Sequence, residues 1–385
     1  MKYVDEFRRG EWARALAQRV HADARPDRCY RLMEFCGGHT HAIARYGLTA
    51  LLPDNIELIH GPGCPVCVLP IGRIDSAIRL VREHPVTLCT YGDVLRVPAS
   101  GGFSLFHARA EGADVRMVYS VDDALALARR EPEREVVFFG LGFETTTPPT
   151  AIALLMARDE GLRNFSVYCN HVLTPPAMTH LLQDGGDLLD GFIGPSHVSA
   201  VIGAAPYRPV AARYRKPIVI TGFEPVDVLQ AVHLLVRQIN EGRAEVENQF
   251  TRAVTEQGNA RAQTCMAQTL QPRDSFEWRG LGLVPFSAWA IRPEFAAWDA
   301  ERRYDLRAAA IADAKACACG EILRGLKKPD DCKLFGVACT PVTPIGACMV
   351  SSEGACAAYY QYGRFLRKTQ AEPALAEPII AGAPA

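Results

Sequence analysis

The sequence predicts an α/β protein built on parallel sheets, followed by a C-terminal region organised around cysteines. Three observations lead to this prediction. Short apolar runs alternate with helical patterns, this alternation changes character at about residue 246, and six of the 13 cysteines fall within residues 317–356. Strand–helix alternation favours parallel sheets, in which sites form at the carboxyl ends of the strands.

The expected strands are short runs rich in β-branched and aromatic residues. They span residues 56–60, 86–90, 115–119, 136–139, 165–169 and 217–221. We expect an amphipathic helix before residue 25, a helix capped by Ser120, and a helix along the apolar stripe from Val228 to Ile239. The alanine-rich residues 308–316 predict a further helix that leads into the cysteines.

We expect the chain to divide into three domains and a tail. Residues 1–125 and 126–245 are predicted as two α/β domains. Residues 246–367 are predicted as a mostly helical domain that holds the C-terminal cysteines. The Ala/Pro-rich residues 368–385 are predicted to be a disordered tail.

Composition argues against several classes of function. The formal net charge is −1 and both signs are mixed along the chain, so we expect no nucleic-acid partner. No apolar run reaches the ~18 residues of a membrane span, and the charged start of the chain lacks the apolar core of a signal peptide. We therefore expect a cytoplasmic protein with no membrane partner. Thiols stay reduced in that compartment, so grouped cysteines indicate metal or transient redox chemistry.

The C-terminal cysteines carry the strongest chemical signal. Their frame, C-x-C-x12-C-x6-C-x8-C-x7-C, comprises Cys317, Cys319, Cys332, Cys339, Cys348 and Cys356. Four thiolates can bind a [4Fe–4S] cluster, and the two others can form a dithiol/disulfide pair beside it. Structural zinc is the main alternative, although zinc sites favour C-x2–4-C spacing over C-x-C. Six unrelated buried thiols are the metal-free alternative.

Two further cysteine motifs lie near the N-terminus. Cys36 begins Cys-Gly-Gly-His-Thr-His, whose two glycines are expected to leave the thiol open to a large partner. His39 and His41 can lower the pKa of that thiol or share a metal with it, and a Cys–His nucleophile is the enzymatic alternative. Cys64 and Cys67 form a C-x-x-C motif before a helix. That placement favours a redox pair, with half of a zinc site as the alternative.

Polar residues follow several of the expected strands. Asp93, Glu144 and Thr145 lie at such ends, where each can serve a site or satisfy the backbone of its own loop. The sequence contains neither a G-x-x-x-x-G-K-[ST] phosphate loop nor a G-x-G-x-x-G motif after a strand. Ordinary nucleotide chemistry is therefore not supported.

Taken together, these motifs resemble the HypD family of [NiFe]-hydrogenase maturation proteins. The matching strings are Cys36-Gly-Gly-His-Thr-His41, Gly61-Pro-Gly-Cys-Pro-Val-Cys67, Gly142-Phe-Glu-Thr-Thr146 and the segment from Cys317 to Tyr360. The resemblance implies two related α/β domains and a third domain with a [4Fe–4S] cluster. It also implies a scaffold, formed with a HypC-type chaperone, on which the Fe(CN)2CO group is assembled. HypE, with HypF upstream, would supply the cyanide.

The resemblance extends to individual residues. Cys36 would ligate the iron of the Fe(CN)2CO group, and the further candidates at that site are His39, His41, Asp93, Glu144 and Thr145. Cys64 and Cys67 would form a nearby redox-active pair. The cysteine-rich segment is also similar to the catalytic part of ferredoxin–thioredoxin reductase, where a cluster sits beside a disulfide.

That second similarity divides the six C-terminal cysteines between two roles. The implied cluster ligands are Cys317, Cys332, Cys339 and Cys356, and the implied redox pair is Cys319 and Cys348. A free-standing [4Fe–4S] dithiol/disulfide oxidoreductase of this kind is the alternative function. The two functions differ at Cys36, which an iron scaffold needs and a reductase does not.

Overall fold

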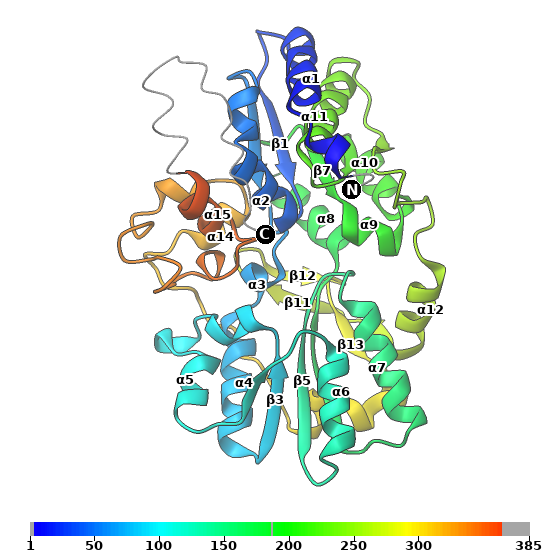
Figure 1. The fold of residues 1–385 in the computed structure, drawn as a ribbon, viewed down its shortest axis with the longest axis vertical. Helices are drawn as coiled ribbons and strands as arrows, with labels where there is room; N and C mark the ends of the chain where they lie inside the picture. Colours follow the sequence, from blue (N-terminus) through cyan, green and yellow to red (C-terminus); the bar gives the residue numbers. More distant parts are fainter. Residues whose placement is uncertain (1–3, 186–187, 364–385) are drawn as a thin grey trace.

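Two parallel sheets form the framework of the computed structural model, which describes residues 4–185 and 188–363. One sheet has the strand order β2-β1-β7-β8-β9 and the other has the order β4-β3-β5-β6. Figure 1 shows the first sheet in the upper part of the molecule, around β1 and β7, and the second in the lower part, around β3 and β5. The predicted α/β class with parallel sheets is confirmed.

The upper sheet draws its strands from two distant stretches of the chain. Its strands are β1 (Tyr30–Glu34), β2 (Ile56–His60), β7 (Gly191–Pro195), β8 (Ile218–Thr221) and β9 (Val246–Asn248). The helices of this part are α1 (Gly10–Asp23), α2 (Gly37–Tyr46), α3 (Pro65–Val68), α8 (Thr174–Gly185), α9 (Ser196–Ile202), α10 (Arg208–Tyr214) and α11 (Pro225–Asn240). Short apolar strands of this kind are buried by helices on the faces of the sheet.

The lower sheet is contiguous in sequence. Its strands are β3 (Val86–Thr90), β4 (Val115–Met117), β5 (Glu135–Gly142) and β6 (Phe165–His171). Its helices are α4 (Ile71–Glu83), α5 (Leu105–Ala110), α6 (Val121–Arg130) and α7 (Thr147–Asp159). Every residue of β3 and β6 is buried, as expected for a parallel sheet covered on both faces.

Strand pairing differs from the predicted division at residue 125. Strands β1 and β2 precede that point but pair into one sheet with β7, β8 and β9, whereas β3 and β4 pair with β5 and β6. The predicted boundary at residue 125 therefore separates strands that belong to the same sheet, and it does so in both sheets. The chain begins the upper sheet, builds the whole lower sheet, and then returns, an arrangement that local patterns along the sequence cannot reveal.

All six predicted strands are confirmed, and the two strands of the upper sheet discussed next were missed for local reasons. Strand β1 was not predicted because a charged residue, Glu34, interrupts its apolar run, and β7 was not predicted because it is Gly-Phe-Ile-Gly-Pro. The helix predicted over residues 308–316 is wrong, since residues 308–314 have no regular secondary structure and residues 315–316 form a turn. Its backbone lies across α4, where Ser76 donates to the Arg307 carbonyl at 3.0 Å and Gly72 leaves room for Ala309.

The region after β9 mixes short helices with short strands. It contains α12 (Ala260–Thr269), β10 (Leu270–Pro272), β11 (Ser275–Trp278), β12 (Gly282–Pro285), β13 (Trp289–Ile291), α13 (Ala300–Arg303), α14 (Cys319–Leu323) and α15 (Ala355–Ala358). The prediction of a mostly helical region is wrong, because two antiparallel strand pairs lie within it. These strands were missed because runs of three or four residues are too short to show a strand period. A separate [4Fe–4S] domain remains a prediction, and the tail predicted at residues 368–385 lies outside the described residues.

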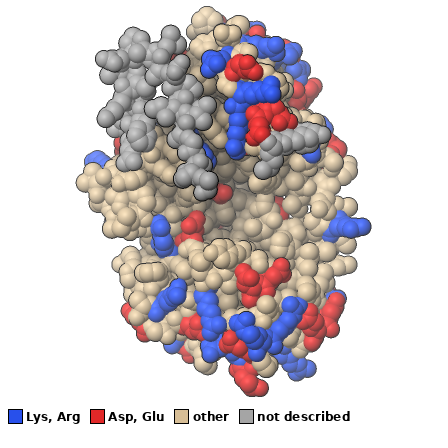
Figure 2. Space-filling model, viewed as in Figure 1, with Lys and Arg blue, Asp and Glu red and all other residues tan. Residues whose placement is uncertain are grey.

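Two further observations concern the charge on the surface and the hydrophobicity of the helices. Acidic and basic side chains are intermingled on the face shown in Figure 2. None of the helices within the described ranges combines the length and the hydrophobicity that a membrane crossing requires.

A buried charge network ties α13 to the lower sheet. Glu301 accepts hydrogen bonds from both Arg73 and Arg273, and Arg73 also donates to the Cys169 carbonyl of β6 at 2.8 Å. The Arg73 side chain is only 6% exposed, so water cannot stabilise its positive charge and the Glu301 carboxylate does so instead. Removing one partner from such a network leaves a buried charge uncompensated.

We therefore expect Glu301→Gln to lower the free energy of unfolding by about 3–5 kcal/mol, because its amide cannot neutralise either arginine. Chemical denaturation at neutral pH measures this change. Glu294→Gln is the matched control, since the Glu294 side chain pairs with Arg292 but is 66% exposed, and it should cost less than about 1 kcal/mol. Equal losses in the two variants would contradict the role given to Glu301.

Candidate functional site

Residues that follow strands of both sheets form the candidate site. Cys36 follows β1, Cys64 follows β2, Asp93 follows β3, and Glu144 follows β5. Carboxyl ends of parallel strands are where α/β proteins place their sites. Figure 1 shows α3, the helix that begins after Cys64, between the two sheets, and Figure 2 shows a recess in the surface between the upper and lower parts.

Cys36 caps the N-terminus of α2 and is partly exposed. Its own N–H donates to Glu34 at 2.9 Å. Desolvation and the carboxyl groups of Glu353 and Glu34 raise the pKa of the Cys36 thiol, while the N–H groups of Gly38 and His39 act in the opposite direction. The free protein therefore keeps Cys36 protonated. A bound cation would reverse this balance, because a coordinated thiol loses its proton.

The glycines around Cys36 serve close packing. A side chain at Gly37 would collide with Glu353, and one at Gly38 would come within 2.7 Å of the Phe223 ring. A side chain at Gly63 would overlap the backbone of Cys36. Gly37 and Gly38 are therefore required by the close packing of this turn against its neighbours. Access of a large partner to the partly exposed Cys36 thiol stays a prediction.

A buried carboxylate behind Cys36 was not predicted from the sequence. Glu34 is fully buried and accepts hydrogen bonds from the Cys36 N–H, from the Thr40 hydroxyl and, at 3.0 Å, from His60 Nδ1. Desolvation raises the pKa of Glu34, which these three donors partly offset. The available signal was a charged residue inside the apolar run Leu32-Met-Glu-Phe35.

The two histidines of the motif take different positions. His39 is fully buried and its Nε2 donates to the carbonyls of Thr221 and Gly222 at 3.2 and 3.0 Å. Burial lowers the pKa of His39 to about 4, so the ring is neutral and anchors α2 to the end of β8. His41 Nδ1 donates to the Ser352 carbonyl at 3.4 Å. Both contacts hold the Cys36 turn against other elements, which argues against a Cys–His nucleophile.

Cys64 and Cys67 form a disulfide at the start of α3. Both are buried. The Cys67 sulfur lies 4.0 Å from the carbonyl of Ala347, and α3 packs against the short 3-10 helix η9 (Ala347–Met349). This helix contains Cys348. The N-terminal pair and the C-terminal cysteines are therefore neighbours.

All six C-terminal cysteines line one cavity. Its other lining residues are Ile322, Phe335, Gly346 and Met349, so it contains no charged side chain. Hydrogen bonds from Cys317 and Cys348 lower the pKa of Cys319, so the Cys319 sulfur lies in contact with each of the other two. Cys319 and Cys348 are fully buried, whereas Cys317 and Cys332 are partly exposed.

The chemistry of this cavity fits an iron–sulfur cluster. In the described part of the chain, no three His, Cys, Asp or Glu side chains converge tightly enough for a single metal ion. A [4Fe–4S] cluster binds each of four thiolates to a different iron, and this cavity is lined by six cysteines and no charged side chain. Gly346 adds to the fit, because a side chain there would come within 2.6 Å of the Cys317 sulfur and intrude between the cysteines.

The remaining predicted residues, Glu144, Thr145 and Asp93, differ in burial and in contacts. Glu144 is buried and accepts hydrogen bonds from the N–H and hydroxyl of Thr174, both at 2.9 Å. Thr145 is exposed. Asp93 lies in η3 (Gly92–Arg96). Desolvation and the charges of Asp93 and Glu34 raise the pKa of Glu353. Glu353, which was not singled out in the sequence, thus brings a second carboxyl group near Cys36.

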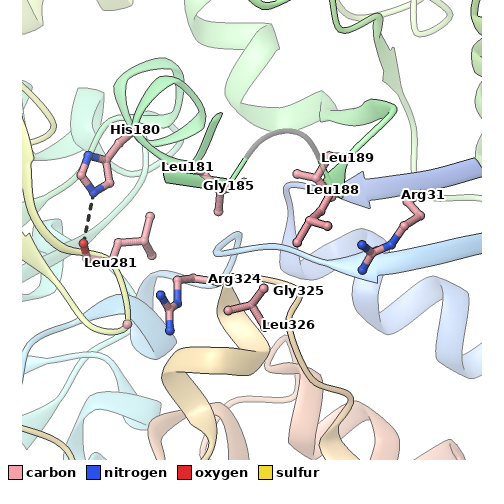
Figure 3. A pocket seen from close by; sticks show the side chains of 11 residues that line it. Arg31, His180, Leu181, Gly185, Leu188, Leu189, Leu281, Arg324, Gly325 and Leu326 are labelled. Carbon is pink, nitrogen blue, oxygen red and sulfur yellow. Dashed lines mark hydrogen bonds between the residues drawn. The ribbon is translucent and has the colours of Figure 1, made fainter. Parts of the chain in front are cut away.

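A leucine-lined pocket lies apart from these residues. Figure 3 shows Leu281 and Leu326 on its walls and Arg324 beside them, and His180 Nε2 donates to the Leu281 carbonyl at 3.1 Å. No cysteine lines it. It is therefore not part of the cysteine site.

Comparison with known proteins identifies the family. The HypD family, described as a hydrogenase formation hypA family, matches residues 11–363. The chain belongs to the HypD family. A hydrogenase maturation factor HypD of Cupriavidus necator is 61% identical over 371 residues, which cover 95% of this chain and 98% of that protein. The HypD of Escherichia coli is 47% identical, with 94% and 98% covered. Resemblance to the HypD family, inferred above from the motifs, is confirmed.

The buried carboxyl of Glu144 predicts a pH dependence of stability. Burial raises its pKa to about 7. The folded protein then keeps a proton that the unfolded chain releases near pH 4.5, so stability falls as pH rises between these values. Relative to Glu144→Gln, the native protein should lose about 3 kcal/mol between pH 4.5 and pH 7. Denaturation curves across this range test the difference, and two parallel curves would exclude a raised pKa.

Proposed function

We propose that this member of the HypD family is a scaffold and redox component for assembly of the Fe(CN)2CO group of [NiFe]-hydrogenase. The observation that carries the proposal is the setting of Cys36. Its thiol is partly exposed at the N-terminus of α2 and lies near the carboxyl groups of Glu34 and Glu353, and its backbone packs on Gly63, which precedes the Cys64–Cys67 disulfide. Its relatives are named hydrogenase maturation factors.

The iron is the cargo, and Cys36 is its anchor. A thiolate is a soft anionic ligand that suits low-spin Fe(II) carrying cyanide and CO. Negative charge around the sulfur favours a cationic metal over an anionic partner. The backbone of Cys36 is held by Glu34, and His39 and His41 hold its helix, so the sulfur is presented without rearrangement.

The other cysteines supply electrons in this proposal. A [4Fe–4S] cluster, held by Cys317, Cys332, Cys339 and Cys356, supplies single electrons when bound. Cys319 and Cys348 act as a dithiol beside it, and the Cys64–Cys67 pair lies next along the path. Contact between the Cys67 sulfur and Ala347, 4.0 Å apart, supports this order.

The partners in this proposal are those that the resemblance to the HypD family implies. A HypC-type chaperone contributes a second cysteine ligand to the iron, and HypE delivers cyanide that HypF prepares. The partial exposure of Cys36 supports access by these proteins. We place the assembly in the cytoplasm, where the free thiols stay reduced.

Loss of the Cys36 sulfur tests the anchor. Cys36→Ser offers a harder and far less acidic oxygen, so protein purified with HypC should lose the cyanide and CO infrared bands. The iron–sulfur absorbance should persist, because that cavity uses other residues. His41→Ala should weaken the bands without abolishing them. Full-strength bands in a folded Cys36→Ser protein would move the anchor to Cys64 and Cys67. Bands absent even from the native complex would favour a free-standing reductase.

The division of the six C-terminal cysteines is tested by metal content. Anaerobically purified protein should contain about four irons and four sulfides per chain. Cys332→Ala and Cys339→Ala should lose them, whereas Cys319→Ala and Cys348→Ala should keep them and lose maturation activity. Iron and sulfide analysis with visible spectra measures this. Stoichiometric zinc in place of iron, or loss of the cluster in Cys319→Ala, would show that the assignment is wrong.

A further inference from the structure

The loop between Cys332 and Cys348 carries two exposed valines. Val337 is 83% exposed and Val342 is 89% exposed. An isolated apolar side chain on a surface is ordinary, whereas apolar side chains grouped at one place mark a contact surface. The proposed function gives these two residues no role.

Each valine lies in a tight turn, a place where glycine, asparagine, aspartate and serine usually occur. Val337 lies between Leu334 and Cys339, and the Cys339 N–H closes this turn by donating to the Leu334 carbonyl at 2.9 Å. An exposed polar residue would be well solvated there. A valine at the same position is the less favourable choice unless another surface covers it.

The second turn is joined to the first. Val342 lies between Thr340 and Thr343, and the Thr343 N–H donates to Thr340 Oγ1 at 3.2 Å. The Thr343 hydroxyl also donates to the carbonyl of Ala338, in the first turn, at 3.3 Å. The two turns therefore form one unit, residues 334–343, which we call the paired turns.

The paired turns adjoin the cysteine cavity. Cys339 belongs to the first turn, and its sulfur accepts the Ile345 N–H at 3.3 Å. Phe335, from the same turn, lines the cavity, and its N–H donates to the carbonyl of the partly exposed Cys332 at 2.9 Å. In the proposed function, Cys332 and Cys339 hold the cluster. A protein docked on the paired turns would therefore stand next to two cluster ligands, and electron transfer falls off steeply with distance.

Positive charge borders the paired turns. Arg96, which follows β3 of the lower sheet, is exposed and donates through Nη2 to the Pro341 carbonyl at 2.7 Å. Lys333 is exposed at the start of the loop, and neither cation forms an ion pair within the part of the chain that the structure describes. The sequence has no acidic residue from 332 to 352, and Asp331, just before it, accepts a hydrogen bond from a backbone N–H. Complementarity of charge therefore favours an acidic partner.

We propose that the paired turns are the docking surface for a small acidic protein that carries single electrons and delivers them to the cluster. This inference rests on the cluster of the proposed function. In the transfer, the reduced carrier loses one electron and the cluster gains it, and no bond is made or broken. Val337 and Val342 supply the apolar contact. Arg96 and Lys333 attract the carrier. Interfaces of such redox pairs are small, with less than about 1,200 Å² buried.

Binding is measured with the oxidised carrier, which separates docking from electron transfer. Full-length protein, purified anaerobically with its iron, is titrated at low ionic strength with an acidic [2Fe–2S] ferredoxin and, separately, with a flavodoxin. At least one should bind, and its affinity should fall as salt screens the charges. Val342→Asp and Lys333→Glu should each weaken this binding about tenfold. If neither carrier binds the native protein, the proposal is overturned.

Electron transfer is measured with the reduced form of the carrier that binds. Stopped-flow absorbance follows its oxidation by the native protein, and the second-order rate constant should fall about tenfold in both variants. Their iron and sulfide content should be unchanged, so that loss of the cluster does not account for the slower rate. If Val342→Asp does not fold, Val337→Asp decides in its place. A native protein that binds the carrier without oxidising it would overturn the proposal.

The controls carry the same chemical changes elsewhere. Ile152 is 42% exposed on α7, which Figure 1 shows far from α14 and α15, so Ile152→Asp adds a charge away from the cysteines. Arg19→Glu reverses an exposed charge on α1. Neither control should change the affinity or the rate. Equal losses in the controls, or less than twofold changes in Val342→Asp and Lys333→Glu, would overturn the proposal.

Failure of the underlying function looks different. If the native protein contains no iron and sulfide, the cluster itself is wrong and the inference about the paired turns falls with it. If the cluster is present but neither carrier docks, or the variants bind it as the native protein does, only the inference about the paired turns is wrong.

Discussion

The parallel pairing of β1 with β2 is the constraint on which the site depends. Its register sets Glu34 beside His60, so that the two side chains hydrogen-bond behind the strand ends. The turns that follow are locked together, because Gly37 N–H donates to the Gly63 carbonyl at 3.0 Å and Gly63 has no room for a side chain. Cys36 and the Cys64–Cys67 pair are therefore held in fixed positions relative to each other. A slip of one residue would turn Glu34 to the other face of the sheet.

The electrostatics of the site favour a metal over a covalent substrate. Glu34, Glu353 and Asp93 bring carboxyl groups to one region, and the first two act with desolvation to keep the Cys36 thiol protonated. A nucleophilic cysteine requires the reverse, namely a nearby cation or a base that removes the proton. His39 supplies no such cation, because burial lowers its pKa to about 4 and keeps the ring neutral, and its Nε2 is held by two carbonyls rather than by the Cys36 sulfur. In the proposed scaffold, the Fe(II) ion would supply the missing positive charge next to the sulfur.

Much of this arrangement was predictable, and the rest was hidden for physical reasons. Strand–helix alternation predicted the parallel sheets, and the spacing of the cysteines singled out all six residues that share one cavity. Local patterns could not show that β1 and β2 return to pair with β7 and β8, because pairing partners lie far apart in sequence. Glu34 was missed for a related reason. A buried charged residue is recognised by what surrounds it, and the His60 side chain that binds Glu34 comes from another strand.

The order of strands has a consequence for synthesis of the chain. The lower sheet is complete once residue 171 has emerged, whereas the upper sheet needs β8 and β9, which end at residues 221 and 248. Domains form as their segments leave the ribosome, so β1 and β2, which carry the Cys36 and Cys64 motifs, must wait for β7 and β8 while the lower sheet folds first. Both motifs reach their final neighbours only when the last cysteines arrive. The nascent chain thus carries Cys36, Cys64 and Cys67 without their C-terminal neighbours for most of its translation, which makes the time spent on the ribosome the period when these thiols are least protected from wrong metals and wrong disulfides.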